Sequence, residues 1–173
     1  MKKIIDSLQL ERIILRIAYQ IIEEMEGKEI AIIGVREGGI APAKVIKKEI
    51  EKIIQKDVPY GELDISMYRE NTSQLFNRPV LNSTYLPFSL KGKIAIIVDD
   101  VVYSGQTGFE AIDALLDISK PEAIKLVALV ETGLRKIPVK PDYIGKKMFL
   151  SPTERVKVFF DLNDKEKTGV FLV

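Results

Sequence analysis

Apolar residues in the first part of the chain alternate between helical and strand-like spacing. Those between residues 13 and 25 recur one, four and five positions apart, which predicts an amphipathic helix that ends at Gly27. The β-branched run over residues 29–35 is short and continuous, as in a strand buried on both faces. A second helical stripe covers residues 45–54, and alternating apolar residues predict a strand over 62–68.

The pattern continues beyond a long polar stretch. Residues 69–89 show neither periodicity, and a connection of that length is usually a lid or a binding loop. The next apolar run predicts a strand that stops at Asp99 and Asp100. After residue 130, Gly, Pro and Lys interrupt the chain repeatedly. The elements predicted after the loop are a strand, a helix and three further strands, over residues 93–98, 107–118, 123–130, 155–162 and 169–173.

Apolar strands that alternate with helices imply an α/β fold with a parallel sheet covered on both faces. The length of 173 residues suits one domain spanning residues 1–173. In such sheets, ligands bind at the carboxyl ends of the strands. The polar segments that follow predicted strands are therefore the first places to look for a site, at residues 35–39, 99–107 and 131–136.

Composition removes several kinds of chemistry. The chain has no Cys, His or Trp, which excludes thiol and imidazole nucleophiles, imidazole bases and Cys or His zinc sites. Its 26 Lys and Arg balance 25 Asp and Glu, so no global field attracts nucleic acid. No run of about 18 apolar residues is present, and charge comes too early for a signal peptide. We expect a cytoplasmic protein with no membrane partner.

The strongest chemical feature is a pair of carboxylates followed by a turn rich in Gly, Ser and Thr. Asp99 and Asp100 end an apolar strand, and the turn opens the helix predicted from residue 107. Unpaired N–H groups at a helix N-terminus bind anions, and the hydroxyls of Ser104 and Thr107 add donors. Paired carboxylates suit sugar hydroxyls or Mg²⁺. Together these groups describe a site for a ribose 5-phosphate.

Two simpler interpretations account for less of the pattern. A strand that ends in solvated aspartates before a capped helix does not explain why Ser-Gly-x-Thr follows the carboxylates so closely. The glycines at 34 and 39 have the spacing of a Walker A loop, but Ile40 stands where that loop requires Lys.

Residues 96–107 resemble the PRPP-binding signature of the type I phosphoribosyltransferases, in which two acidic residues precede a Thr/Ser-Gly-x-Thr turn. Three further blocks, 61–69, 133–138 and 142–146, resemble the PyrR family in order and spacing. The resemblance implies a central parallel sheet flanked by helices with a small β-rich hood. It also implies transfer of phosphoribosyl from PRPP to uracil with Mg²⁺, giving UMP and pyrophosphate, together with regulation of the pyrimidine operon.

The resemblance assigns roles by position. Asp99 and Asp100 would contact the ribose hydroxyls, directly or through Mg²⁺, and Arg69 opens a loop that would close over PRPP. The 5-phosphate would lie on the phosphate turn, formed by Tyr103, Ser104, Gly105, Gln106 and Thr107. Pyrophosphate would lie on the pyrophosphate turn, which often contains a non-proline cis peptide and is formed by Arg36, Glu37, Gly38 and Gly39. The base would be recognised by the base loop, formed by Glu131, Thr132, Gly133 and Leu134.

The chain departs from the family pattern at each of these segments. Glu37-Gly38-Gly39 replaces the usual Thr-Arg-Gly, which removes a cation and adds a carboxylate where pyrophosphate would bind. Gln106 replaces an Arg, and the base loop lacks the usual Arg and His. On the first helix, Leu15 and Tyr19 replace the Thr and His of the family's RNA-binding face. Basic residues alone support weak RNA binding without sequence preference.

Three functions therefore stay open. The first is a uracil phosphoribosyltransferase that uses PRPP and a nucleobase, and the second is a UMP-sensing RNA-binding attenuator with little catalysis. The third is a phosphoribosyltransferase for another base, or a degenerate nucleotide binder. In each case the resemblance implies a homo-oligomer.

Overall fold

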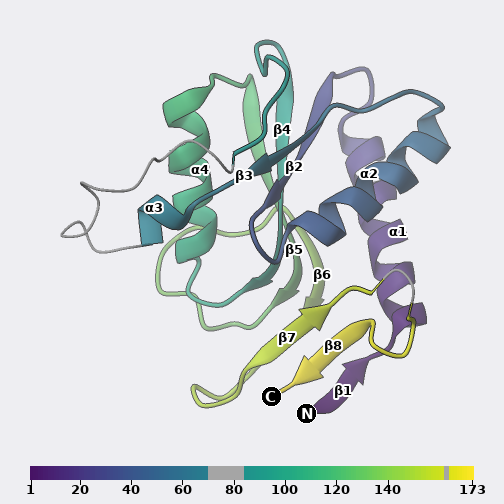
Figure 1. The fold of residues 1–173 in the computed structure, drawn as a ribbon, viewed down its shortest axis with the longest axis vertical. Coiled ribbons are helices and arrows are strands. Elements are labelled where there is room, and N and C mark those ends of the chain that lie inside the picture. The colour runs from purple at the N-terminus through teal and green to yellow at the C-terminus, as the bar shows by residue number, and fades with distance from the viewer. Residues whose placement is uncertain (70–83, 162–163) are drawn as a thin grey trace.

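A five-stranded parallel sheet forms the centre of the protein (Figure 1). The computed structural model describes residues 1–69, 84–161 and 164–173. The strand order is β3-β2-β4-β5-β6, so β2, the first strand of this sheet along the chain, lies inside it, with β3 on one side and the later strands on the other. These strands are β2 (Ile30–Val35), β3 (Tyr60–Leu63), β4 (Ile94–Val102), β5 (Ala123–Glu131) and β6 (Tyr143–Lys147).

Helices cover both faces of this sheet (Figure 1). Alternation along β2 divides the core, because successive strand side chains point to opposite faces. Ile30 and Ile32 belong to the cluster that includes the first two helices, whereas Ala31 and Ile33 pack in the cluster on the other face. The helices of the first face are α1 (Ser7–Glu24) and α2 (Ile40–Ile54), and those of the second are α3 (Ser66–Arg69) and α4 (Gln106–Ile118).

Local sequence explains where the long helices start and stop. The Asp6 carboxylate accepts a hydrogen bond from the Gln9 N–H at 2.8 Å, and the Gln9 side chain accepts one from the Asp6 N–H, which forms a capping box for α1. After α1 ends, Gly27 adopts φ of 73°, a conformation that glycine enters without a steric penalty. In α2, Pro42 lies in the first turn, where its missing N–H costs no hydrogen bond.

A second, three-stranded antiparallel sheet forms a hood beside one end of the main sheet (Figure 1). Its order is β1-β8-β7, so the two ends of the chain pair with each other. Its strands are β1 (Lys2–Ile5), β7 (Val156–Phe159) and β8 (Gly169–Leu172). The sequence pattern predicted the α/β sheet and the resemblance implied the small β-rich hood; the structure has both, although β1 and β6 were missed.

Two predicted elements have different boundaries in the structure. The strand predicted over 62–68 ends at Leu63, because the Asp64 carboxylate accepts a hydrogen bond from the Ser66 N–H at 2.9 Å and the chain turns into α3. The strand predicted to stop at Asp99 continues to Val102, because pairing with β5 extends to Glu131. Both aspartates therefore lie within β4 rather than after it.

The long polar stretch lies partly outside the described residues. Of the predicted loop over 69–89, residues 70–83 are not described. The returning chain pairs with β3, where Tyr85 and Glu62 exchange two backbone hydrogen bonds of 2.7 and 2.8 Å. Among the described residues, no helix has the length and apolar character needed to cross a membrane.

Candidate active site

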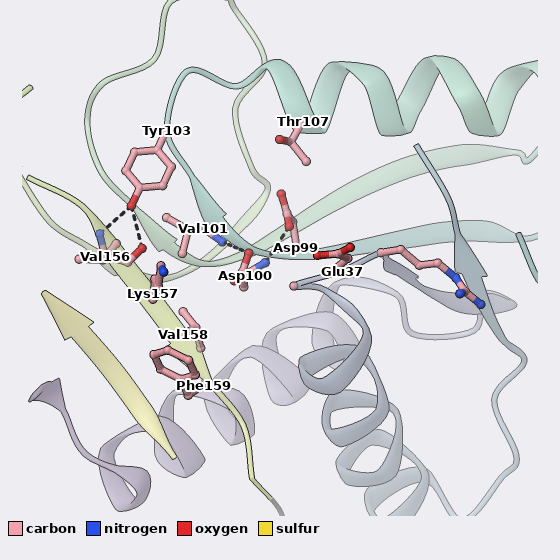
Figure 2. A pocket seen from close by; sticks show the side chains of 12 residues that line it. Glu37, Asp99, Asp100, Val101, Tyr103, Thr107, Val156, Lys157, Val158 and Phe159 are labelled. Atoms are coloured by element: carbon pink, nitrogen blue, oxygen red, sulfur yellow. Dashed lines mark hydrogen bonds between the residues drawn. The ribbon is translucent and has the colours of Figure 1, made fainter. Parts of the chain in front are cut away.

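A cavity of about 400 Å³ opens at the carboxyl ends of β2 and β4 (Figure 2). Three segments far apart in the chain line it: the pyrophosphate turn, the end of β4 with the start of α4, and strand β7 of the hood. The lining residues predicted from sequence are Arg36, Glu37, Gly38, Asp99, Asp100, Tyr103 and Thr107. Position at the carboxyl ends of parallel strands explains why these turns meet.

The two aspartates have different environments although they are adjacent. Asp99 is only 4% exposed, whereas Asp100 is half-buried. Figure 2 shows Asp99 directed toward Thr107 at the start of α4. The Asp99 carboxylate accepts a hydrogen bond from the Asp100 N–H at 2.9 Å, and the Asp100 carboxylate accepts one from the Val101 N–H at 2.8 Å. These backbone bonds limit the freedom of both side chains and keep them at the cavity.

The pyrophosphate turn packs directly against the end of β4. A Cβ added at Gly38 would lie 2.4 Å from the Asp100 carboxylate, and one at Gly39 would lie 2.0 Å from the Val98 carbonyl oxygen. The Gly39 N–H closes the turn with a 2.8 Å hydrogen bond to the Val35 carbonyl. The peptide bond between Arg36 and Glu37 is cis, as the resemblance implied. The turn's glycines therefore bring its backbone against the Asp100 carboxylate.

The phosphate turn connects β4 to α4 through Gly105, whose φ of 89° favours glycine. The Ser104 hydroxyl accepts a hydrogen bond from the Gln106 N–H at 3.2 Å, and the Gln106 side chain donates to Glu110 at 2.9 Å. The side-chain amide of the exposed Gln106 therefore faces Glu110 along α4 rather than the cavity.

Tyr103 connects the phosphate turn to the hood. Its hydroxyl accepts a hydrogen bond from the Val156 N–H at 2.6 Å and donates one to the Val156 carbonyl at 2.8 Å (Figure 2). The Tyr103 side chain thus holds β7 against the phosphate turn. Because this hydroxyl is occupied by Val156, the backbone of Tyr103 is the part suited to a phosphate. Strand β7 supplies a cavity wall that the sequence did not suggest, because nothing in the periodicity of this short strand marks it as part of a site.

The base loop lines a separate cavity of about 510 Å³, which shares no lining residue with the first. Glu131 is 5% exposed and its carboxylate lies 2.9 Å from the Arg135 Nε. Thr132 is fully buried and donates to the Val102 carbonyl at 3.1 Å, which is a structural contact. Glu131 and Gly133 line this cavity, whereas Thr132 and Leu134 do not.

Arg69 is the last residue of α3, at the start of the undescribed segment. Residues 70–83, the larger part of the loop that the resemblance implied would close over PRPP, therefore lie outside the described residues. The structure shows that this loop starts at the end of α3, beyond the carboxyl end of β3.

The residues at the first cavity fit a magnesium ion shared with a substrate. Mg²⁺ in phosphate sites is usually held by one or two carboxylates together with the substrate's own oxygens. Asp99 and Asp100 supply that number at one cavity. In the described part of the chain, no group of three or more acidic, His or Cys side chains could hold a metal alone. The donor set therefore suits an ion that enters with its substrate.

Comparison with known proteins shows which family has this sequence. The family model described as "Phosphoribosyl transferase domain" matches residues 1–162. A protein named "Bifunctional protein PyrR" from Elusimicrobium minutum is 41% identical over 175 residues, which cover 100% of this chain and 98% of the relative. The chain belongs to the phosphoribosyltransferase family, in its PyrR branch. A PyrR protein from Pelotomaculum thermopropionicum is 38% identical, covering 98% of this chain and 94% of the relative.

Solved structures confirm the phosphoribosyltransferase fold. A hypoxanthine-guanine phosphoribosyltransferase from Bacillus anthracis matches with a TM-score of 0.68 and 25% identity, over 90% of this chain and 86% of that one. The glutamine mutant from an analysis of an invariant aspartic acid in HPRTs matches with a TM-score of 0.77 and 17% identity, over 100% and 95% of the two chains. The second match covers the whole chain of this PyrR-type phosphoribosyltransferase, so the structural similarity includes the hood as well as the main sheet.

Proposed function

We propose that this protein transfers the 5-phosphoribosyl group of PRPP to uracil, giving UMP and pyrophosphate. The observation that carries the proposal is the meeting of Asp99 and Asp100 with the Arg36–Gly39 turn at one cavity. One part of this cavity offers carboxylates to ribose hydroxyls, and the other offers backbone and a guanidinium to phosphate oxygens. The identity of 41% to a PyrR protein over the full chain favours uracil as the base.

In this reaction the bond from ribose C1′ to the pyrophosphate oxygen breaks, and a bond from C1′ to uracil N1 forms. Uracil N1 releases its proton to solvent, and pyrophosphate leaves with the electron pair of the broken bond. Positive charge develops on the ribose, and carboxylates fixed nearby stabilise such charge without reorganising. The 4% exposure of Asp99 strengthens this effect, because few water molecules screen it.

Arg36 and the backbone of the pyrophosphate turn would hold the leaving group. Asp99 and Asp100 would hold Mg²⁺ together with PRPP, and the ion when bound would offset the charge of the departing pyrophosphate. Strand β7, tied down by Tyr103, would exclude water from one side of the ribose. Orientation and charge compensation suffice for this chemistry, which agrees with a chain that has no His.

The test is formation of UMP from PRPP, uracil and Mg²⁺ by the purified protein. We expect Asp99→Asn combined with Asp100→Asn to lower kcat/KM by at least about a hundredfold, because two charges that stabilise the transition state are lost. The unfolding midpoint should stay close to that of the unchanged protein. Hypoxanthine and guanine serve as comparison bases. Faster transfer to either purine would contradict the assignment of uracil, and no transfer to any base would overturn the proposal.

We also propose RNA binding as a second activity, directed at pyrimidine-operon leader RNA. Tyr19 on α1 is 54% exposed, and one turn before it Arg16 hydrogen-bonds the carbonyls of Ile144 and Gly145 in β6. The exposed Lys146 follows in β6. An exposed aromatic ring with cations nearby suits the stacking of unpaired bases.

A further inference from the structure

We propose that Glu62 is a positioning residue that aims the Arg36 guanidinium at the pyrophosphate part of the cavity. The inference rests on the proposed function and extends it to a residue that does not line the cavity. Glu62 lies in β3, the strand next to the one that carries the pyrophosphate turn.

The Glu62 carboxylate is the centre of a small polar cluster. Its Oε2 lies 2.9 Å from the Arg36 Nη2, and its Oε1 accepts a 3.0 Å hydrogen bond from the Tyr60 hydroxyl. The Lys44 Nζ lies 3.4 Å from the same Oε1. The Glu62 side chain is 15% exposed, so these contacts are partly shielded from solvent. Each carboxylate oxygen therefore has a defined role: one holds Arg36, and the other is held by Tyr60 and Lys44.

The backbone that carries this carboxylate is held from two sides. Glu62 is paired with Gly34 of β2 on one side, and on the other it exchanges two hydrogen bonds with Tyr85. Burial and the hydrogen bond to Glu62 also raise the pKa of the Tyr60 hydroxyl above its ordinary value, so this hydroxyl donates to Glu62 over a wide range of pH. Because Glu62 is held in place in this way, its carboxylate restricts the directions in which the Arg36 side chain can point.

The charges at the cavity explain why Arg36 needs such a holder. Arg36 and Lys157 are the cations that line it, against the carboxylates of Glu37, Asp99 and Asp100. A guanidinium free to rotate would form ion pairs with these carboxylates, because charge-assisted pairs are the strongest available to it. Glu62 binds one Nη group from outside the cavity. Arginine has five N–H donors, so others stay available for phosphate oxygens.

The variant that tests this is Glu62→Gln, with Glu51→Gln as the matched control. The Glu51 side chain is 24% exposed, pairs with Lys47 and accepts a 2.8 Å hydrogen bond from the Val58 N–H, but it does not line the cavity. We expect Glu62→Gln to weaken binding of magnesium pyrophosphate and raise the KM for PRPP by about tenfold, with little change in the KM for uracil. Glu51→Gln should change none of these values, whatever its effect on the unfolding midpoint.

A double variant separates positioning from a general structural effect. In an Arg36→Gln background, adding Glu62→Gln should change pyrophosphate affinity no further, because the group that it positions is already gone. Equal pyrophosphate affinity in Glu62→Gln and Glu51→Gln would overturn the proposal, as would an undiminished effect of Glu62→Gln in that background. Failure of the unchanged protein to bind pyrophosphate would also overturn it.

Calorimetry with pyrophosphate needs no turnover, so the two proposals can fail separately. A protein that binds pyrophosphate with the expected dependence on Glu62, yet forms no UMP, would refute the uracil reaction and retain the role of Glu62.

Discussion

Gly38 and Gly39 are adjacent, but different groups occupy the space that a side chain would need at each of them. At Gly38 the space that a Cβ would need is filled by the carboxylate of Asp100, the far end of a side chain that can rotate. At Gly39 it is filled by the Val98 carbonyl, which belongs to the backbone of β4. A methyl group at the first position displaces the Asp100 carboxylate, and at the second it pushes the turn away from β4.

We therefore expect Gly38→Ala to fold with a nearly unchanged urea midpoint and to lose about tenfold or more in PRPP affinity with Mg²⁺, because Asp100 must leave its place. Gly39→Ala should lower the free energy of unfolding by about 3 kcal/mol. Urea denaturation and calorimetry with PRPP measure the two effects. A Gly38→Ala variant that binds PRPP as tightly as the unchanged protein would show that the position of Asp100 does not matter for binding.

At the scale of elements, α1 is joined to the edge of the main sheet by polar side chains at its end. The Tyr143 hydroxyl of β6 donates to Glu24 at 2.6 Å, and the Lys125 Nζ of β5 lies 2.9 Å from the other Glu24 oxygen. The hydrogen bonds from Tyr143 and Lys125 hold the pKa of Glu24 below its ordinary value. The hydrogen bond to Glu24 likewise holds the pKa of Lys125 above its ordinary value.

A lowered pKa in the folded state means that the ionised Glu24 stabilises the fold above its unfolded-state pKa, and that this contribution is lost as the pH falls through the folded-state pKa. We expect Glu24→Gln to cost about 0.5 kcal/mol at pH 7, in keeping with a half-exposed carboxylate, and less at pH 3. Urea denaturation at both pH values measures this difference.

Glu23→Gln is the control, since in the described part of the chain Glu23 forms no ion pair within 4 Å. A cost for Glu24→Gln that stays the same at pH 3 would show that packing, and not charge, joins α1 to the sheet.

At the scale of the whole molecule, the charge is nearly balanced, with 26 basic and 25 acidic residues. A general attraction to RNA is therefore weak, and sequence preference must come from a local surface. Tyr19 supplies the aromatic ring of the surface proposed above, in a region where Arg16 ties α1 to β6.

We expect pyrimidine-operon leader RNA to bind more tightly than a scrambled RNA in a filter-binding assay, with affinity that falls as salt rises. Tyr19→Ala should weaken leader binding by about tenfold, because it removes a stacking surface. Leu8→Ala is a suitable control, since Leu8 is similarly exposed at 53% and is apolar but not aromatic. Equal affinity for the two RNAs would refute the regulatory activity.

Prediction from sequence succeeded where the signal was local. The stripe of α1, the apolar run of β4 and the helix after the phosphate turn each depend on neighbours in the chain, and each was found. Strands β1 and β6 were missed because their stability comes from pairing with β8 and β5 rather than from their own alternation. The strand predicted over 62–68 was too long because the hydrogen bond of Asp64 to the Ser66 N–H was not anticipated.

The sequence by itself determined the α/β layering and the order of the chemical groups, with twin carboxylates directly before a turn that opens a helix. It did so because periodicity and capping act within a few residues. Only the tertiary structure decided that Gly38 meets Asp100, that β7 walls the cavity and that Glu62 holds Arg36. These contacts join residues 26 or more positions apart, and strand pairing and packing bring them together.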